Sequence, residues 1–103
     1  MNISDRFGTF CAQGEQAVEY LNSNIIPALK TGENVTLDFE GVKNMNSSFA
    51  NAMFSNLIRL EGTDVLSQLS MINVRSNVET AIKMGLYLGT TSLTRQHDED
   101  ESL

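Results

Sequence analysis

The stretch that decides the fold runs from Val35 to Gly62 and has the sequence VTLDFEGVKNMNSSFANAMFSNLIRLEG. Its first residues alternate, with polar residues between the apolar Val35, Leu37 and Phe39. A period of two predicts a half-buried β-strand. After Gly41 the apolar residues recur with a helical period until Gly62. The sequence therefore predicts a strand over 35–39 followed by a helix over 48–61.

Three short polar residues, Asn46, Ser47 and Ser48, stand directly before this helix. Such side chains accept hydrogen bonds from the free N–H groups of a helix start. We expect Ser47 in the loop or cap position and Ser48 on the outer face of the helix. A phosphate placed here would meet unpaired backbone donors and the positive end of the helix dipole.

The predicted helix divides into two faces when its residues are placed at about 100° each. One half is apolar, and we expect it to be buried: Phe49, Ala50, Met53, Phe54, Leu57, Ile58 and Leu60. The other half is polar apart from Ala52, and Arg59 is its one cation: Ser48, Asn51, Ser55, Asn56 and Arg59. This division predicts a helix that packs along a sheet and leaves a polar, nearly uncharged face outside.

These residues carry a family resemblance. A strand end of the form Asp-Phe-x-x-Val precedes a Ser-Ser-Phe-Ala helix start, here Asp38, Phe39, Val42 and the residues 47–50. This order resembles the STAS domain of bacterial anti-sigma-factor antagonists, and more closely a bacterial STAS-like family of uncharacterised function. The resemblance covers about 3–88, and its specific part is 37–62.

The resemblance implies a phosphorylation site. In the antagonists an Asp-Ser-Ser/Thr-Gly-Leu motif opens the helix, and a partner kinase phosphorylates one serine; alignment puts Ser47 in that place. This chain departs from the motif, with Asn46 for the Asp, Phe49 for the Gly and Ala50 for the Leu. The bulky Phe49 beside the acceptor changes the surface on which a kinase would dock.

Two readings of the serines remain open. Asn and Ser often precede helices only as caps, which stabilise by about 1 kcal/mol. The other reading is a non-enzymatic STAS-like interaction module that docks on a histidine-kinase-like ATPase or a similar switch protein, as the resemblance implies. The expected docking surface combines the helix start with the outer helix face: Asn46, Ser47, Ser48, Asn51, Ser55 and Arg59.

An alternative function uses the same helix N-terminus as an anion site for a small molecule or nucleotide. A hydrolase or transferase is the least favoured class. The only histidine, His97, lies in an acidic stretch and has no spacing that ties it to Cys11. Neither a Walker loop nor a dinucleotide fingerprint nor a metal-ligand cluster occurs. We therefore expect no catalytic residue, metal or cofactor.

Composition indicates a single small domain. The chain has 103 residues, 41% of them hydrophobic, and a net charge of −6, which argues against direct binding to nucleic acid. One cysteine, no signal-peptide pattern and no apolar run of membrane-spanning length favour a cytoplasmic protein. We expect the domain over 1–94 and a disordered acidic tail over 95–103. The oligomeric state stays open.

The remaining pattern predicts an α/β, STAS-like fold with a four- or five-stranded mixed sheet and helices mainly on one face. We expect a short strand at 1–3, a loop at 5–13, a helix at 14–30 and a strand at 69–74. The strands 35–39 and 69–74 should be parallel because a helix joins them. A last helix should start at a Ser76 cap, with Glu79 in a capping box and an inward apolar face of Val78, Ile82 and Leu86. The second choice is a small flavodoxin-like domain.

Overall fold

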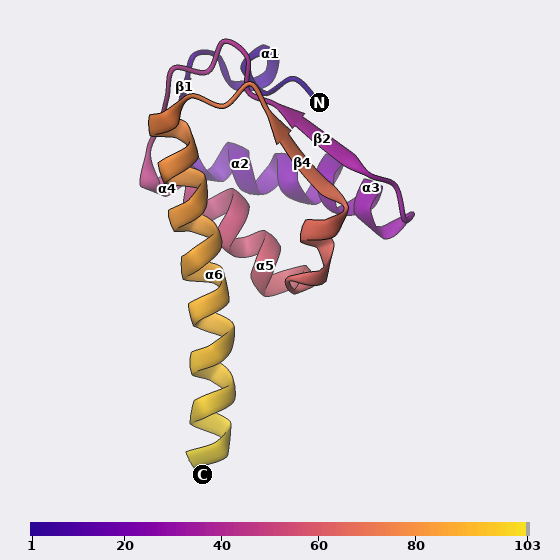
Figure 1. Cartoon of the computed structure of the whole chain (residues 1–103), viewed down its shortest axis with the longest axis vertical. Helices are drawn as coiled ribbons and strands as arrows, with labels where there is room; N and C mark the ends of the chain where they lie inside the picture. Colours follow the sequence, from indigo (N-terminus) through magenta and orange to yellow (C-terminus); the bar gives the residue numbers. More distant parts are fainter. Residues whose placement is uncertain (103) are drawn as a thin grey trace.

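The computed structural model describes the main chain of residues 1–102 and the side chains of residues 1–92 (Figure 1). Helices and short strands alternate along the chain: α1 (Ile3–Phe7), β1 (Phe10–Cys11), α2 (Gly14–Tyr20), η1 (Leu21–Ile25), α3 (Ile26–Lys30), β2 (Val35–Asp38), β3 (Asn44–Met45), α4 (Ser47–Ala50), η2 (Asn51–Ser55), α5 (Asn56–Glu61), η3 (Asp64–Ser67), β4 (Leu69–Ile72) and α6 (Ser76–Ser102). This order confirms a mixed α/β architecture. The predicted acidic tail at 95–103 and His97 lie outside the residues whose side chains are described.

The four strands form two separate two-stranded parallel sheets, so the expected four- or five-stranded mixed sheet is wrong. β2 pairs with β4 from Val35↔Leu69 to Asp38↔Ile72, which confirms that these strands are parallel. β3 pairs with β1 instead of extending this sheet. Between β2 and β3 the chain turns at Gly41, whose φ is 89°.

The N-terminal segment also differs from the prediction. The expected strand at 1–3 is reduced to a single bridge between Asn2 and Asp38. The side chain of Asn2 accepts a hydrogen bond from the N–H of Asp5, which starts α1 at once. The segment expected to be a loop at 5–13 therefore contains the end of α1 and all of β1.

The helix predicted over 14–30 has that extent, the one predicted over 48–61 begins one residue earlier at Ser47, and each contains one wide π turn. α2, η1 and α3 together span residues 14–30, and α4, η2 and α5 together span residues 47–61. In the first helix the π turn leads into Pro27, which lacks the N–H that a regular turn would use. In the second helix Asn56 Nδ2 donates to the carbonyl of Ala52 at 2.8 Å, inside the wide turn.

The π turn at 51–55 explains two wrong burial predictions. One extra residue in a turn rotates everything downstream by about the 100° that separates neighbouring residues. Ser55, expected outside, is consequently turned inward and is only 8% exposed. Leu60, expected inside, is turned outward and is 59% exposed. The rest of the predicted apolar face is buried as expected: Phe49, Ala50, Met53, Phe54, Leu57 and Ile58.

α6 packs against the helix over 47–61, with Gly85 beside Ala50 and Phe54 and Gly89 beside Ser55 and Ile58. Val78 and Ile82 are buried, as predicted. Ser76 is the first helical residue, and the Glu79 carboxylate pairs with Lys83 Nζ at 3.0 Å instead of closing a capping box. Among the described residues, no helix is long and apolar enough to cross a lipid bilayer.

Candidate functional site

Asn46 holds the start of the helix over 47–61 in place. Its Oδ1 accepts from the N–H of Phe49 at 2.9 Å, and its Nδ2 donates to the carbonyl of Ala12 at 3.1 Å. Its own N–H donates to the carbonyl of Cys11 at 3.0 Å. Asn46 is therefore the N-cap, which leaves Ser47 as the first helical residue with no capping task. The helix start is tied to β1, so Ser47 has a fixed position on the surface.

The two serines lie on different sides of this helix. Both are exposed. Ser48 faces the start of α2, because a Cβ added to Gly14 would lie 3.1 Å from Ser48 Oγ. Ser47 instead borders a hollow shared with α6. The structure thus separates two residues that the sequence treats as one pair.

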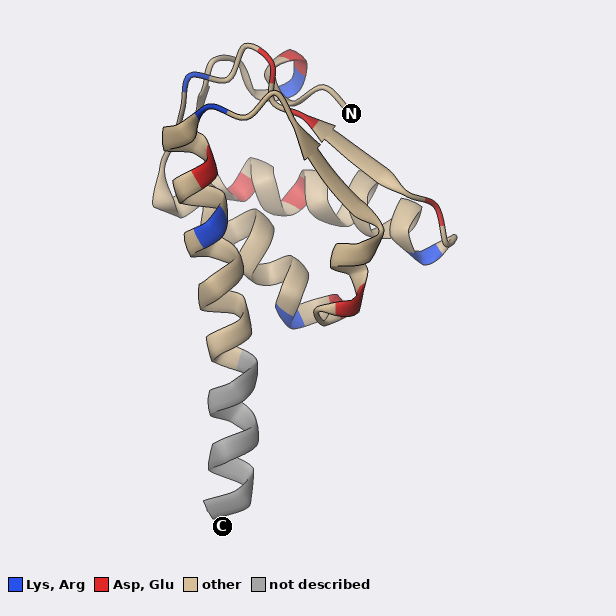
Figure 2. Cartoon of the chain, viewed as in Figure 1, with Lys and Arg blue, Asp and Glu red and all other residues tan. Residues whose placement is uncertain are grey.

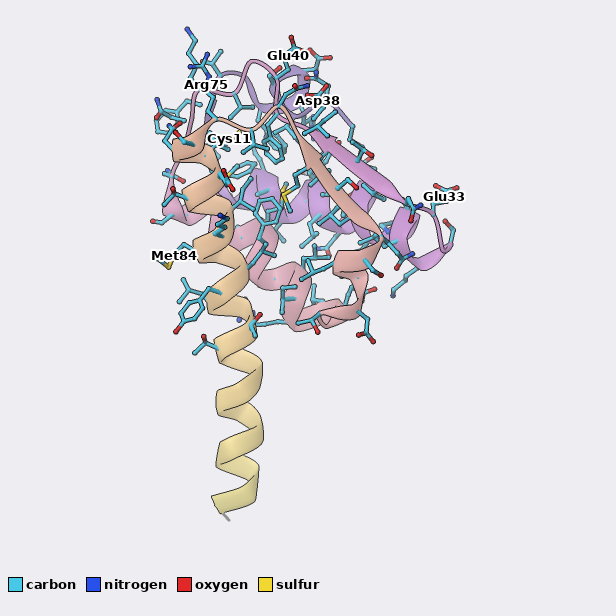
Figure 3. All side chains as sticks on the ribbon, viewed as in Figure 1. Cys11, Glu33, Asp38, Glu40, Arg75 and Met84 are labelled. Carbon is cyan, nitrogen blue, oxygen red and sulfur yellow. The ribbon has the colours of Figure 1, made fainter. Side chains whose placement is uncertain are left out.

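We call this hollow the Ser47 groove. It has a volume of about 260 Å³ between α4, η2 and α6, and its lining residues are Ser47, Ala50, Asn51, Asn77, Thr80, Ala81, Met84 and Leu88. Met84 is 53% exposed and Leu88 is 39% exposed. Figure 3 shows Met84 projecting from the outer side of α6, away from the core. The groove is therefore an apolar hollow with the exposed hydroxyl group of Ser47 at its border.

Only part of the predicted docking surface belongs to this groove. Asn51 is half-buried and lines it. Ser55 does not belong to the surface, since α6 and the π turn bury it. Arg59 is exposed and its guanidinium donates to Asn56 Oδ1, but it lies twelve residues from Ser47, or about 18 Å along a helix. The predicted set is therefore not one continuous patch.

Sequence reasoning missed the contribution of α6. Its groove residues are Asn77, Thr80, Ala81, Met84 and Leu88. A signal was present, because Met84, Tyr87 and Leu88 recur at spacings of three and four on the side opposite Val78, Ile82 and Leu86. A helix with two apolar stripes needs cover on both sides. Tyr87, 65% exposed, continues the uncovered stripe beside the groove.

Two glycines bring α6 close enough to form the groove wall. A Cβ added to Gly85 would lie 2.7 Å from the carbonyl oxygen of Ala50, and one added to Gly89 would lie 2.9 Å from that of Ser55. Such contacts are shorter than real Cβ atoms make, so the approach requires glycine at both places. The spacing of four residues puts both on one side of α6.

The titratable groups near these elements have structural explanations. Cys11 is fully buried, and burial raises the pKa of its thiol to about 11, so it is protonated and a poor nucleophile (Figure 3). Hydrogen bonds from the Glu40 N–H and then from the Asn73 side chain lower the pKa of Asp38, whose carboxylate fastens the end of the sheet. No group of three His, Cys, Asp or Glu residues within the described part of the chain could hold a metal ion.

A family model described as a STAS-like domain of unknown function matches residues 19–79, which is more than half of the chain. The chain belongs to this STAS-like family. The resemblance carried by the strand end and the Ser-Ser-Phe-Ala helix start is thereby confirmed. The match includes both strands of the β2–β4 sheet, the helix over 47–61 and the start of α6. Met84 and Leu88 lie beyond it, so the outer wall of the Ser47 groove is not part of the matched STAS-like region. No curated protein and no solved structure matches the chain.

Proposed function

We propose that this STAS-like chain is a non-enzymatic interaction module in which a partner protein docks in the Ser47 groove, and that phosphorylation of Ser47 releases the partner. The observation that carries the proposal is the exposed hydroxyl of Ser47 at the border of an apolar groove, on a helix start that Asn46 anchors. The partner class, a histidine-kinase-like ATPase, rests on the similarity to anti-sigma-factor antagonists.

Apolar burial would drive the docking. Full burial of a Leu or Met side chain contributes about 1.5–3 kcal/mol. Since Met84 and Leu88 are already partly covered, a partner gains roughly 1 kcal/mol from each. Tyr87 adds an amphipathic side chain of the kind enriched at interfaces.

Phosphorylation would oppose docking through charge. A phosphoserine adds about −1.5 to −2 charges, and the N-terminal end of a helix tolerates them well while they are solvated. None of the residues that line the groove is Lys or Arg. A partner that covers Ser47 would therefore bury a charge without a counter-ion, which is costly. The fold would keep its stability while the interface loses affinity.

The test needs the partner, which can be captured through the groove itself. A photo-crosslinking residue at position 84 in cells of the native host should trap it, while the same residue at position 59, outside the groove, should not. Trapping of the same proteins from both positions would argue against the Ser47 groove.

The switch is then tested with Ser47→Asp, Ser47→Ala and Ser48→Asp. Ser48→Asp is the matched control because it places the same charge in the same helical turn but faces Gly14. We expect Ser47→Asp to weaken partner binding by at least about tenfold, because an unpaired buried charge costs more than 1.4 kcal/mol. Ser47→Ala and Ser48→Asp should bind like wild type, and all three variants should melt within a few degrees of it. Equal binding by Ser47→Asp and wild type would refute the switch and leave Ser47 with a purely structural role.

A second candidate function is anion or nucleotide binding at the same place. Among the described residues, no hydrogen bond involves the main-chain N–H of Ser47 or Ser48, so both donors are available to an anion. Calorimetric titration with ATP, GDP and acidic metabolites tests this directly. Saturable binding that shifts the amide resonances of Ser47 and Ser48 would favour it over the docking module.

A further inference from the structure

The β4 strand has one open edge. β2 lies between β4 and the bridge to Asn2, so β4 is the outer strand of its sheet. Phe39 N–H donates to the carbonyl of Ile72 at 3.0 Å, and Val35 N–H donates to that of Gln68 at 2.7 Å. Because alternate residues of a strand direct their backbone groups to opposite sides, Leu69 and Met71 direct theirs outward. Neither makes a backbone hydrogen bond on that side to the part of the chain that is described.

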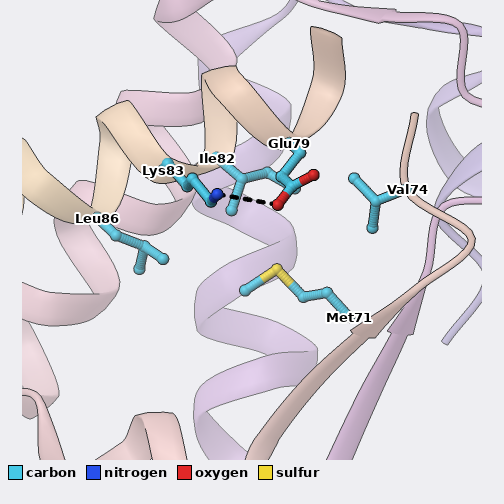
Figure 4. A pocket seen from close by; sticks show the side chains of 6 residues that line it. All are labelled: Met71, Val74, Glu79, Ile82, Lys83 and Leu86. Atoms are coloured by element: carbon cyan, nitrogen blue, oxygen red, sulfur yellow. Dashed lines mark ion pairs between the residues drawn. The ribbon is translucent and has the colours of Figure 1, made fainter. Parts of the chain in front are cut away.

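An apolar groove runs beside this edge. Its volume is about 440 Å³, within the range of ligand-binding pockets. Met71 and Val74 line it from the strand, and Glu79, Ile82, Lys83 and Leu86 line it from α6. Figure 4 shows the two sets of side chains facing each other across the hollow. We call it the β4 groove.

We propose that the β4 groove binds an extended peptide segment of a partner protein, which pairs with β4 as an added strand. Backbone N–H and C=O groups in a row are best satisfied by another strand, which is the common mode of strand addition. The side chains of alternate residues in the added strand would enter the groove. This binding site uses the opposite side of α6 from the Ser47 groove and does not depend on the function proposed there.

The walls restrict what can occupy the groove. An added strand lies only about 4.8 Å from its neighbour, whereas a helix is about 10 Å wide. α6 lies across the hollow from β4. The space between them therefore suits a single extended segment better than the sheet edge of a second folded copy. The two charges in the lining, Glu79 and Lys83, lie one turn apart on α6 (Figure 2) and pair with each other at 3.0 Å. The occupant should therefore be uncharged and apolar at the positions that point inward.

The edge itself carries little protection against strand addition. Natural edges are often guarded by Lys, Pro or a bulge. The sequence of β4 is Leu-Ser-Met-Ile, and its pairing with β2 is regular over all four residues. Its short length is the one protective feature, and this limits the added segment to a few paired residues.

The first experiment selects peptides from a phage-displayed library of random twelve-residue sequences on the intact chain. We expect enriched peptides with apolar residues at alternate positions. Binding should slow amide hydrogen exchange at Leu69 and Met71 by at least about tenfold, since both N–H groups become hydrogen-bonded. N-methylation of the peptide at the residues that face β4 should weaken binding by about tenfold or more, because each lost donor leaves a carbonyl of β4 unpaired.

Two variants locate the site. Met71→Lys puts a charge in the groove and should weaken peptide binding by about tenfold. Met84→Lys, in the Ser47 groove on the other side of α6, should leave it within about twofold. Since Met71 is half-buried and its replacement can disturb the fold, the N-methylated peptides on the wild-type chain provide an independent measurement. Three results would each overturn the proposal: no enriched peptide, enriched peptides that leave Leu69 and Met71 unprotected, or a concentration-dependent dimer that protects them without any peptide.

Discussion

Replacing Gly85 with alanine tests the helix contact on which the Ser47 groove depends. In an open helix position, Gly→Ala stabilises by about 0.8–1.0 kcal/mol because alanine loses less backbone entropy. At Gly85 the new methyl group would lie 2.7 Å from the carbonyl oxygen of Ala50 and 3.2 Å from the Cβ of Phe54. A main-chain carbonyl has no rotamer with which to move aside, so α6 must shift outward.

Two opposing effects set the change in the free energy of unfolding that Gly85→Ala should cause. Overpacking of a well-packed contact costs about 1–3 kcal/mol, and the upper half applies because the obstacle is main chain. Subtracting the gain in helix propensity leaves a net loss of about 1–2 kcal/mol. For a domain of this size each kcal/mol lowers Tm by roughly 4–8 °C. Gly85→Ala should therefore melt roughly 4–15 °C below wild type.

Thermal unfolding followed by circular dichroism measures this shift, and urea unfolding checks it. Thr80→Ala provides the control on the same helix, since Thr80 is exposed and alanine is the better helix former. Thr80→Ala should keep or slightly raise Tm. If Gly85→Ala raises Tm in the same way, α6 does not approach Ala50 closely. The result would then also contradict the Ser47 groove, because α6 forms its outer wall.

Three further predictions concern the core, the thiol and the C-terminal end. Leu57→Ala should lower the free energy of unfolding by about 2–5 kcal/mol in urea, because Leu57 is 1% exposed; a loss below 1 kcal/mol would contradict its core position. Cys11 should react with a thiol reagent at pH 8 only on unfolding. Because the pKa of its thiol is raised to about 11 in the folded state from 9.0, the unfolded chain releases the proton first, and the free energy of unfolding should fall between about pH 9 and pH 11. Cys11→Ala should remove that part of the pH dependence. A chain that ends near Leu93 should melt within about 2 °C of the full chain, since the residues beyond it carry a charge run without apolar periodicity; a larger drop in Tm would show that those residues contribute to folding.

The sequence by itself determined the main helices, the strands of the β2–β4 sheet and the family. The period of two over 35–39, the helical period up to Gly62 and the inward face of Val78 and Ile82 all appear in the structure as predicted. These features depend on side-chain spacing within one element, which is a local property. The parallel pairing of β2 and β4 followed as well, because a helix that joins two strands of one sheet makes them parallel.

Only the tertiary structure decided how the candidate site is built. The π turn at 51–55 turned Ser55 inward and Leu60 outward. No residue type in the turn predicts a π turn from the sequence. The Ser47 groove needs α6 beside α4, and the β4 groove needs α6 across from Met71. The Ser47 groove joins residues as far apart along the sequence as Ser47 and Leu88, and the β4 groove joins residues as far apart as Met71 and Leu86. Their formation depends on which surfaces the whole chain buries together, and local periodicity carries no information on that choice.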